Sequence, residues 1–258
     1  MSIFVPRWET PPGVKTVISH RLGGVSSPPF DSFNVASHVE DDPAAVEQNR
    51  QTLGTQIEER FSVGPDIQWL NQVHKTQVRV LTPQNTKSDK IPEADGAYTS
   101  SRNIACAVLT ADCLPVLMCN KQGTEVAAVH AGWRGLAAGI LTEALLRFRS
   151  PPEHVQCYLG PAISQSAFQV GKDVHDAFCE AATSRTYAEH PSSAFVSEPN
   201  VSGKLYADIY RLARSELRGA GVRDISGGDY CTFSERERFY SFRRDGSTGR
   251  MASLIWIS

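Results

Sequence analysis

The chain has 258 residues, of which 41% are hydrophobic and 21% charged, and its formal net charge is −2. This composition is typical of a soluble globular protein that can bury a sizeable core in one large or two small domains. The nearly balanced charge argues against a surface built mainly for nucleic acid or for an anionic membrane.

No targeting or membrane segment is expected. The N-terminal stretch MSIFVPRWETPPG lacks the basic region and apolar core of a signal peptide. The most apolar long window, 104–119, is too short for a membrane span and is interrupted by Thr110, Asp112 and Pro115. The six cysteines form no CxxC pair, which favours free thiols and a cytoplasmic location.

The first third of the chain predicts strands and one helix. Residues 14–20 form a strand that leads into a loop rich in Gly, Pro and Ser. Asp42, followed by a proline, is a typical N-cap for a helix that should run to about Gly54. Alternating apolar residues over 67–73, and a second β-like run over 77–81, predict two further strands.

The central part of the chain predicts a hairpin followed by a helix. ADGAYT (94–99) is a turn before the strand 104–110, and a break then separates that strand from the strand 114–119. NKQG is a turn sequence that joins this strand to the returning strand 125–131. Apolar residues at helical spacing then predict one helix over 135–148.

The last third predicts a buried strand over 155–160 and a helix over 170–182. The polar connection 183–200 is a candidate for a mobile flap. An amphipathic helix follows over 205–221 and ends at one of its last two glycines, and 251–257 is the final strand.

Together these elements predict an α+β fold. Strands outnumber helices and occur as hairpins, which favours a single layered domain over 1–258 with mixed β-sheets flanked by helices. No GxGxxG motif or phosphate-binding P-loop follows a strand, so a dinucleotide site is not expected.

Three residues with metal-ligating side chains stand at strand ends or breaks, namely His74, Cys113 and His130. Zinc accepts imidazole and thiolate, and catalytic zinc sites use three protein ligands and one open position. Spacing alone also permits a metal-free cysteine hydrolase, in which Cys113 is the nucleophile, His130 is the base, and His74 or Asp112 orients the base. A histidine at a strand end or a cysteine between apolar strands is, however, more often purely structural.

Longer motifs resemble the YfiH-type family, whose members are described as polyphenol oxidases (laccase-like) and as purine nucleoside phosphorylases. The matching segments are LNQVHKTQV, ADGAYT, LTADCLPVLM, AVHAGWRGLAAGI, YLGPAISQSAFQVG and the C-terminal FYSFRRDGSTGRMASLIWI. They follow the family order over nearly the whole chain.

This resemblance implies a mixed α/β sandwich-like domain with a zinc site made by His74, Cys113 and His130. It also implies phosphorolysis of adenosine, inosine and methylthioadenosine, and deamination of adenosine. The implied partners are therefore purine nucleosides and phosphate. Copper-dependent oxidation of phenols is a further activity described for relatives.

Two residues are candidates for catalytic roles. In deamination, zinc activates water for attack on C6 of adenine, and Asp112 could move protons or support the neighbouring ligand Cys113. Asp112 could equally be a loop-capping residue. In phosphorolysis, Arg134 could bind phosphate, because the planar guanidinium suits that anion and a helix starts nearby.

Four residues are candidates for substrate contacts. Trp133 could stack on a purine or serve as a packing anchor. Arg21, before two glycines, is a weaker candidate for phosphate, and Asn71 and Gln72 could supply amide contacts. Gly132 allows the backbone to approach a crowded corner closely.

Two alternatives stay open. A multicopper oxidase needs more histidines than the seven present here, which form no HxH pair, although Cu²⁺ could replace Zn²⁺ in a single site. A zinc-stabilised binding module would need a fourth protein ligand, for which Cys231 and His38 are candidates. The sequence carries no signal for a particular oligomeric state.

Overall fold

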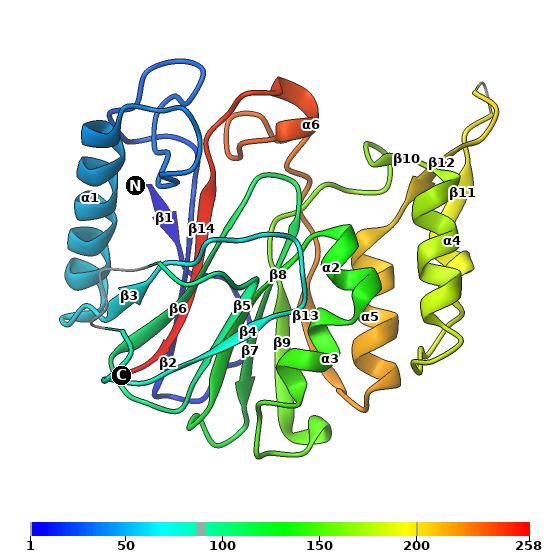
Figure 1. Ribbon diagram of the computed structural model, residues 1–258. Coiled ribbons are helices and arrows are strands. Elements are labelled where there is room, and N and C mark those ends of the chain that lie inside the picture. The colour runs from blue at the N-terminus through cyan, green and yellow to red at the C-terminus, as the bar shows by residue number, and fades with distance from the viewer. Residues whose placement is uncertain (1, 87–90, 200) are drawn as a thin grey trace.

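Two β-sheets packed face to face form the centre of the structure, and helices cover their outer faces (Figure 1). This computed structural model describes residues 2–86, 91–199 and 201–258. From one side to the other, the layers are helix α1, a five-stranded sheet, a six-stranded sheet and a second group of helices.

The five-stranded sheet is mixed. In spatial order its strands are β1 (Ile3–Phe4), β2 (Val14–Ser19), β14 (Met251–Ile257), β6 (Ile104–Thr110) and β3 (Asp66–Gln68). The C-terminal strand β14 lies at its centre, antiparallel to both β2 and β6, whereas β3 is parallel to β6. Helix α1 (Pro43–Phe61) covers the outer face.

The six-stranded sheet is mixed as well. In spatial order it contains β13 (Asp224–Gly227), β9 (Val155–Leu159), β7 (Leu114–Asn120), β8 (Val126–Ala131), β5 (Gly96–Thr99) and β4 (Val78–Leu81). Helices α2 (Trp133–Ala138), α3 (Ile140–Leu145) and α5 (Ile209–Gly219) cover its outer face (Figure 1).

A smaller sheet lies at the edge of the molecule beside α4 (Lys172–Ala181). Its strands are β10 (Gln169–Gly171), β12 (Lys204–Ala207) and β11 (Phe195–Ser197). The remaining short elements are η1 (Pro152–His154), η2 (Pro191–Ala194) and α6 (Phe242–Asp245).

The two-residue period of the strands divides the core into layers. In β7, Val116 and Met118 pack toward the helices, while Leu117 and Cys119 pack toward the other sheet. Every residue of β7 is buried, because both faces of this strand are covered, and its continuous apolar run follows from that. The predicted α+β fold with mixed sheets and flanking helices is confirmed.

Two helix boundaries differ from the sequence prediction. Helix α1 continues past Gly54 to Phe61, because the fully buried Leu53 and Ile57 hold the following turns against the sheet. This burial outweighs the roughly 1 kcal/mol cost of a glycine inside a helix. The helix predicted over 135–148 is instead two short helices, since Gly139 adopts a positive φ of 97° between them.

Several strand boundaries also differ. The sequence predicts a turn over 94–99, whereas residues 96–99 form the buried strand β5, which is paired with β4 and β8 on its two sides. The strand predicted over 67–73 ends at Gln68. The connection 183–200 contains η2 and β11, and Asn200 lies outside the described residues.

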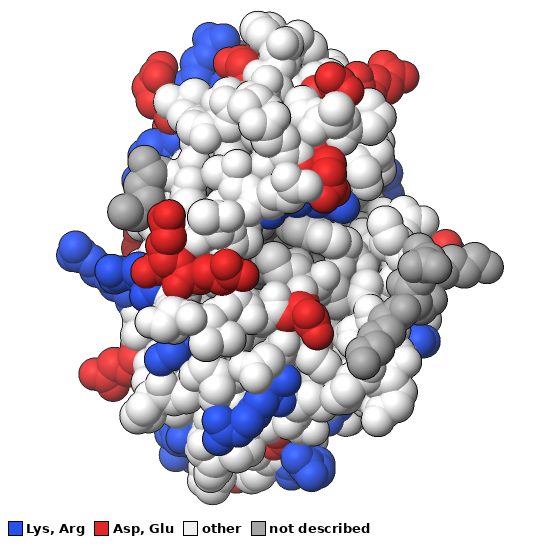
Figure 2. Space-filling model, turned by 90° about the vertical axis from the view of Figure 1, so that its left-hand side faces the viewer, with Lys and Arg blue, Asp and Glu red and all other residues white. Residues whose placement is uncertain are grey.

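Among the described residues, no helix combines the length and the apolarity that a membrane crossing requires. On the side of the molecule where α1 lies, acidic and basic side chains are interspersed (Figure 2).

The buried Glu125, just before β8, ties several loops to the six-stranded sheet. Its carboxylate accepts hydrogen bonds from the Tyr98 hydroxyl (2.6 Å), the Asn120 amide (3.0 Å), and the backbone N–H groups of Arg149 (2.8 Å) and Ser150 (3.2 Å). Burial alone would raise the pKa of Glu125, but these hydrogen bonds outweigh burial and lower the pKa to about 2.

We expect Glu125→Gln to lower the free energy of unfolding at pH 7 by about 2 kcal/mol, because an NH₂ group would face hydrogen-bond donors in a buried site. The folded-state pKa of Glu125 lies below its usual value of 4.5. Its stabilisation is therefore complete only above pH 4.5 and is lost as the pH falls toward 2. Urea unfolding should show a smaller difference between wild type and variant at pH 3 than at pH 7. An unchanged difference would contradict this account.

Candidate metal centre

His74, Cys113 and His130 come together at one end of the six-stranded sheet. Their ligand atoms all lie within 4.8 Å of one another. His74 lies in the loop between β3 and β4, Cys113 precedes the first residue of β7, and His130 is the penultimate residue of β8. The structure thus joins three residues that are 39 and 17 positions apart in the sequence.

The β7–β8 hairpin explains why two of these residues meet. The strands are antiparallel, with Pro115 opposite His130 and Leu114 opposite Ala131. Cys113 therefore leaves β7 at the end where β8 presents His130. Sheet register, set by two fully buried strands, fixes this part of the site.

The buried Asp95 brings in the third residue. One carboxylate oxygen of Asp95 lies 2.8 Å from Nδ1 of His130 and accepts the backbone N–H of His74 at 2.9 Å. The other oxygen accepts the backbone N–H groups of Val73 (3.2 Å) and Lys75 (2.8 Å). Burial raises the pKa of Asp95, but the hydrogen bonds from His130 and the backbone outweigh burial and lower it.

The surroundings of Cys113 favour the ionised form of its thiol. Its Sγ lies 3.9 Å from Nε2 of His74, and the rings of His74 and His130 meet edge to face at 4.8 Å. Burial would raise the pKa of Cys113, but the two histidines outweigh it and lower the pKa to about 6. At neutral pH the sulfur is therefore largely a thiolate, the form that binds metal.

Gly132 leaves the space that the three side chains occupy. A Cβ at this position would lie 2.9 Å from Cδ2 of His74 and 3.1 Å from Sγ of Cys113. A Cβ atom cannot lie this close to either atom unless the His74 and Cys113 side chains move. The sequence-based expectation of a crowded corner at Gly132 therefore has a specific cause in the three converging side chains.

Two nitrogen donors and one thiolate fit a divalent zinc or copper ion. Among the described residues, no fourth His, Cys, Asp or Glu joins the cluster. His38 lies on the wall of the adjoining cavity, and Cys231 lies in a separate cavity. A metal site needs both histidines close to the thiol, whereas the catalytic pair of a metal-free cysteine hydrolase needs only one histidine. Both histidines lie close to the Cys113 thiol, so the geometry favours a metal site.

The triad opens into a cavity of about 410 Å³. Three arginines, Arg134, Arg243 and Arg250, are among its lining residues. Asp112 is the one acidic residue among the described residues that line this cavity. The wall is therefore rich in positive charge next to the candidate metal ligands.

Aromatic and apolar side chains complete the cavity. Trp133, Phe168 and Phe242 contribute rings to its lining. Phe242 is 58% exposed, which is high for a phenylalanine, and the guanidinium of Arg250 lies 5.7 Å from the centre of its ring. The cavity thus offers flat apolar surfaces together with cationic groups.

The structure places the predicted substrate residues unequally. Trp133 and Arg134 line the cavity, with the guanidinium 4.4 Å from the Trp133 ring centre. Gln72 also lines it, but its amide is hydrogen-bonded to the backbone N–H and C=O of Leu109. Asn71 is exposed and lies outside the cavity lining.

Arg21 is not part of this cavity. Its guanidinium lies 3.0 Å from the Asp31 carboxylate and 3.5 Å from that of Asp245. These two ion pairs explain why an arginine stands beside the glycine-rich loop. Arg21 is therefore paired with two carboxylates at a place outside the cavity.

Asp112 lines the cavity in a constrained position. Its backbone has a φ of 90°, which is uncommon for a residue with a side chain. One carboxylate oxygen accepts the Thr232 hydroxyl at 2.6 Å, and the other accepts the backbone N–H of Arg243 at 2.7 Å. Asp112 therefore connects the turn that carries Cys113 to the C-terminal segments.

Sequence reasoning missed Asp95, Phe242, Arg243 and Arg250. All four lie within motifs that matched the family, ADGAYT and FYSFRRDGSTGRM. The local pattern of each motif is that of a turn, and only the fold brings these segments to the cavity. In the sequence, the one feature that could have pointed to this part of the cavity is a pair of arginines and an adjacent aromatic residue in a segment rich in Gly and Ser.

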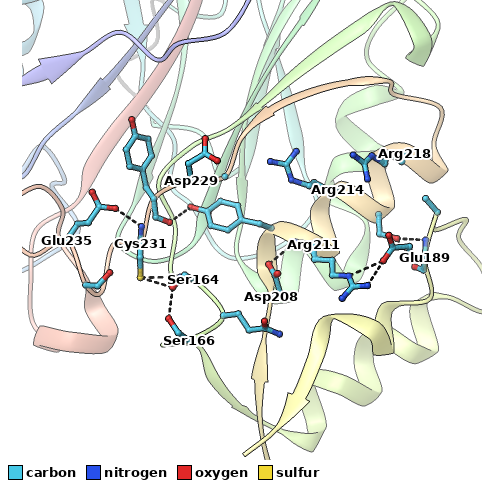
Figure 3. Close-up of a pocket in the computed structure, with 17 residues that line it drawn as sticks. Ser164, Ser166, Glu189, Asp208, Arg211, Arg214, Arg218, Asp229, Cys231 and Glu235 are labelled. Atoms are coloured by element: carbon cyan, nitrogen blue, oxygen red, sulfur yellow. Dashed lines mark hydrogen bonds and ion pairs between the residues drawn. The ribbon is translucent and has the colours of Figure 1, made fainter.

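A larger cavity of about 760 Å³ lies elsewhere, along α5 (Figure 3). Its lining combines acidic and basic residues, and Arg211 forms an ion pair with Glu189 at 2.7 Å. At its other end, the thiol of Cys231 accepts a hydrogen bond from the Ser164 hydroxyl at 3.0 Å. This cavity does not include the three candidate metal ligands.

We expect Gly132→Ala to weaken metal binding at least tenfold, because the added methyl group would occupy the space of the His74 and Cys113 side chains. Gly54→Ala is the matched control, since a Cβ there meets no atom within 4 Å. Metal content after dialysis against a chelator would compare the two. Equal retention of metal by both variants would contradict the steric account.

The sequence matches the family described as multi-copper polyphenol oxidoreductase laccase over residues 15–258. The "Purine nucleoside phosphorylase YfiH" of Shigella flexneri is 46% identical over 260 residues, covering 99% of this chain and 98% of the relative. The "Purine nucleoside phosphorylase PA4543" of Pseudomonas aeruginosa is 46% identical and covers 98% of each chain. The crystal structure of Neisseria meningitidis protein NMB0706 superposes with a TM-score of 0.90 at 45% identity over 100% of both chains.

Proposed function

Because this chain belongs to the multi-copper polyphenol oxidoreductase laccase family, also represented by the YfiH proteins, we propose that it is a zinc-dependent purine nucleoside phosphorylase. Its proposed substrates are phosphate and the nucleosides adenosine, inosine and methylthioadenosine. The names of the relatives support the reaction class.

One observation carries the proposal, namely that the candidate metal ligands and three arginines share a cavity with a single carboxylate among its described lining residues. Guanidinium groups bind phosphate through paired N–H donors. Arg134 is exposed at the cavity and forms no ion pair with a described residue, so its donors are available to an anion. Helix α2 has only six residues, so the case rests on guanidinium groups rather than on its N-terminus.

The aromatic rings suit the purine. Stacking of a base on an aromatic side chain contributes about 1–3 kcal/mol. Phe242 is exposed at the cavity, and Trp133 lies on its wall beside Arg134. A cavity of about 410 Å³ is within the size range of small-ligand sites.

In the proposed reaction, an oxygen of phosphate attacks C1′ of the ribose while the bond from C1′ to the purine nitrogen breaks. The bonding electron pair leaves with the purine, which takes up a proton, and the other product is ribose 1-phosphate, or 5-methylthioribose 1-phosphate when methylthioadenosine reacts. Arg134, Arg243 and Arg250 would hold phosphate against the sugar and balance its charge. A zinc ion held by His74, Cys113 and His130 would supply a Lewis acid to this cavity.

We extend the proposal to deamination of adenosine, in which water replaces the amino group at C6 and ammonia leaves. Asp112 is the carboxylate on the cavity wall, and the Thr232 hydroxyl and the Arg243 N–H hold it in one orientation. Each oxygen of a carboxylate has two acceptor sites, so Asp112 can still accept a proton from water. This role requires no phosphate.

A polyphenol oxidase is the alternative that the family description suggests. Multicopper chemistry needs several copper ions, whereas the described residues contain one cluster of three ligands. Copper bound in place of zinc would occupy this same site, because Cu²⁺ binds nitrogen and sulfur donors more tightly than Zn²⁺. The cavity chemistry therefore favours the nucleoside reaction.

Product analysis by liquid chromatography and mass spectrometry tests the proposal. Zinc-loaded protein should convert adenosine with phosphate to adenine and ribose 1-phosphate, and without phosphate to inosine. Cys113→Ala should lose both reactions, and Cys179→Ala, which changes a half-buried thiol on α4, should retain them. Absence of both reactions in zinc-loaded wild type would refute the nucleoside function, and turnover retained by Cys113→Ala would refute the metal site.

A second measurement separates the two ligand contacts. We expect Arg134→Met to raise the KM for phosphate about tenfold, since one charge-assisted hydrogen bond contributes roughly 1.5–3 kcal/mol. We expect Phe242→Ala to raise the KM for the nucleoside about tenfold through lost stacking. Arg79→Met, an exposed change on β4 outside the cavity, is the control. The reverse pattern of KM changes would contradict these assignments.

A further inference from the structure

Asp95 is a completely buried carboxylate that lies beside the metal ligands without being one of them. It is 0% exposed and precedes β5, and the described ligand cluster contains only His74, Cys113 and His130. A buried carboxylate is costly unless hydrogen bonds satisfy it. Among the described residues, the hydrogen bonds to the Asp95 side chain all come from His130 and from the loop 73–75.

Asp95 fixes His130 twice. Its carboxylate oxygen lies 2.8 Å from Nδ1 of His130, and its backbone carbonyl accepts the backbone N–H of His130 at 2.7 Å. The first contact places the ring proton on Nδ1, which leaves Nε2 free as the metal donor. The second contact holds the Cα from which the ring projects.

Asp95 also fixes His74, but through the backbone. His74 has a φ of 60°, a left-handed conformation that side chains disfavour. Three successive N–H groups, from Val73 to Lys75, converge on the Asp95 carboxylate at 2.8–3.2 Å. Because the His74 side chain is itself exposed, this backbone clamp is the main constraint that the structure provides on its position.

We propose that Asp95 is the positioning residue of the metal centre, and that this one carboxylate holds two of the three ligands in place. The inference rests on the proposed metal function of the triad.

Asp95→Asn tests this role with almost no change in shape. The Asn side chain would turn an NH₂ group toward N–H donors of either His130 or the 73–75 loop. Zinc affinity, measured by competition between a chromophoric chelator and the purified protein, should fall 10- to 100-fold. Asp95→Glu should not restore it, because the longer side chain shifts both sets of hydrogen bonds.

Glu125→Gln is the matched control. Glu125 is 2% exposed and also accepts backbone N–H groups, from Arg149 and Ser150, but it does not contact the ligands. It should lose stability and keep wild-type zinc affinity. Zinc affinity of Asp95→Asn within twofold of wild type, or an equal loss in Glu125→Gln, would overturn the inference.

A measurement on wild-type protein covers the case in which Asp95→Asn does not fold. In protein loaded with ¹¹³Cd and labelled with ¹⁵N-histidine, cadmium should couple to Nε2 of His130, and Nδ1 should carry a slowly exchanging proton. Coupling to Nδ1 would overturn the role of Asp95. Wild-type protein that binds neither zinc nor cadmium would instead contradict the proposed function.

Discussion

The antiparallel register of β7 and β8 is the constraint on which the site depends. Both strands are buried along their whole length between the second sheet and the helices, so a shift by one residue would exchange the side chains packed against the helices with those packed against the other sheet. The register places Cys113 next to the end of β8, where His130 and Gly132 follow each other closely. A fully buried part of the fold therefore positions two of the candidate ligands directly.

Around this hairpin, charge is arranged in two zones. Behind the ligands lies Asp95, which is buried and saturated with hydrogen bonds. In front of them lies the cavity, with Arg134, Arg243 and Arg250 on its wall. A cation held by the negative zone and an anion held by the positive zone would meet at the triad. This arrangement suits phosphate transfer to a sugar better than oxidation of a neutral phenol.

The family description names a copper oxidase, whereas the similar proteins of Shigella flexneri and Pseudomonas aeruginosa are named purine nucleoside phosphorylases. One donor set can account for both names. Two imidazoles and a thiolate bind zinc, and they also bind copper when copper is present. The identity of the bound metal therefore depends on the triad, whereas the reaction depends on the arginines and aromatic rings of the cavity.

Local periodicity and capping are enough to predict the fold class, most strands and the helix start at Asp42–Pro43. Residue type makes His74, Cys113 and His130 candidates, and the resemblance to the YfiH-type family implies that they form one ligand set. Tertiary structure decided that Arg21 is paired with carboxylates, that Asn71 lies outside the cavity, and that α1 continues past a glycine. It also brought Asp95 to the ligands and the C-terminal arginines to the cavity. The reason is physical, because sheet pairing between segments far apart in the chain sets these neighbours, and no local pattern encodes which distant strand a segment will join.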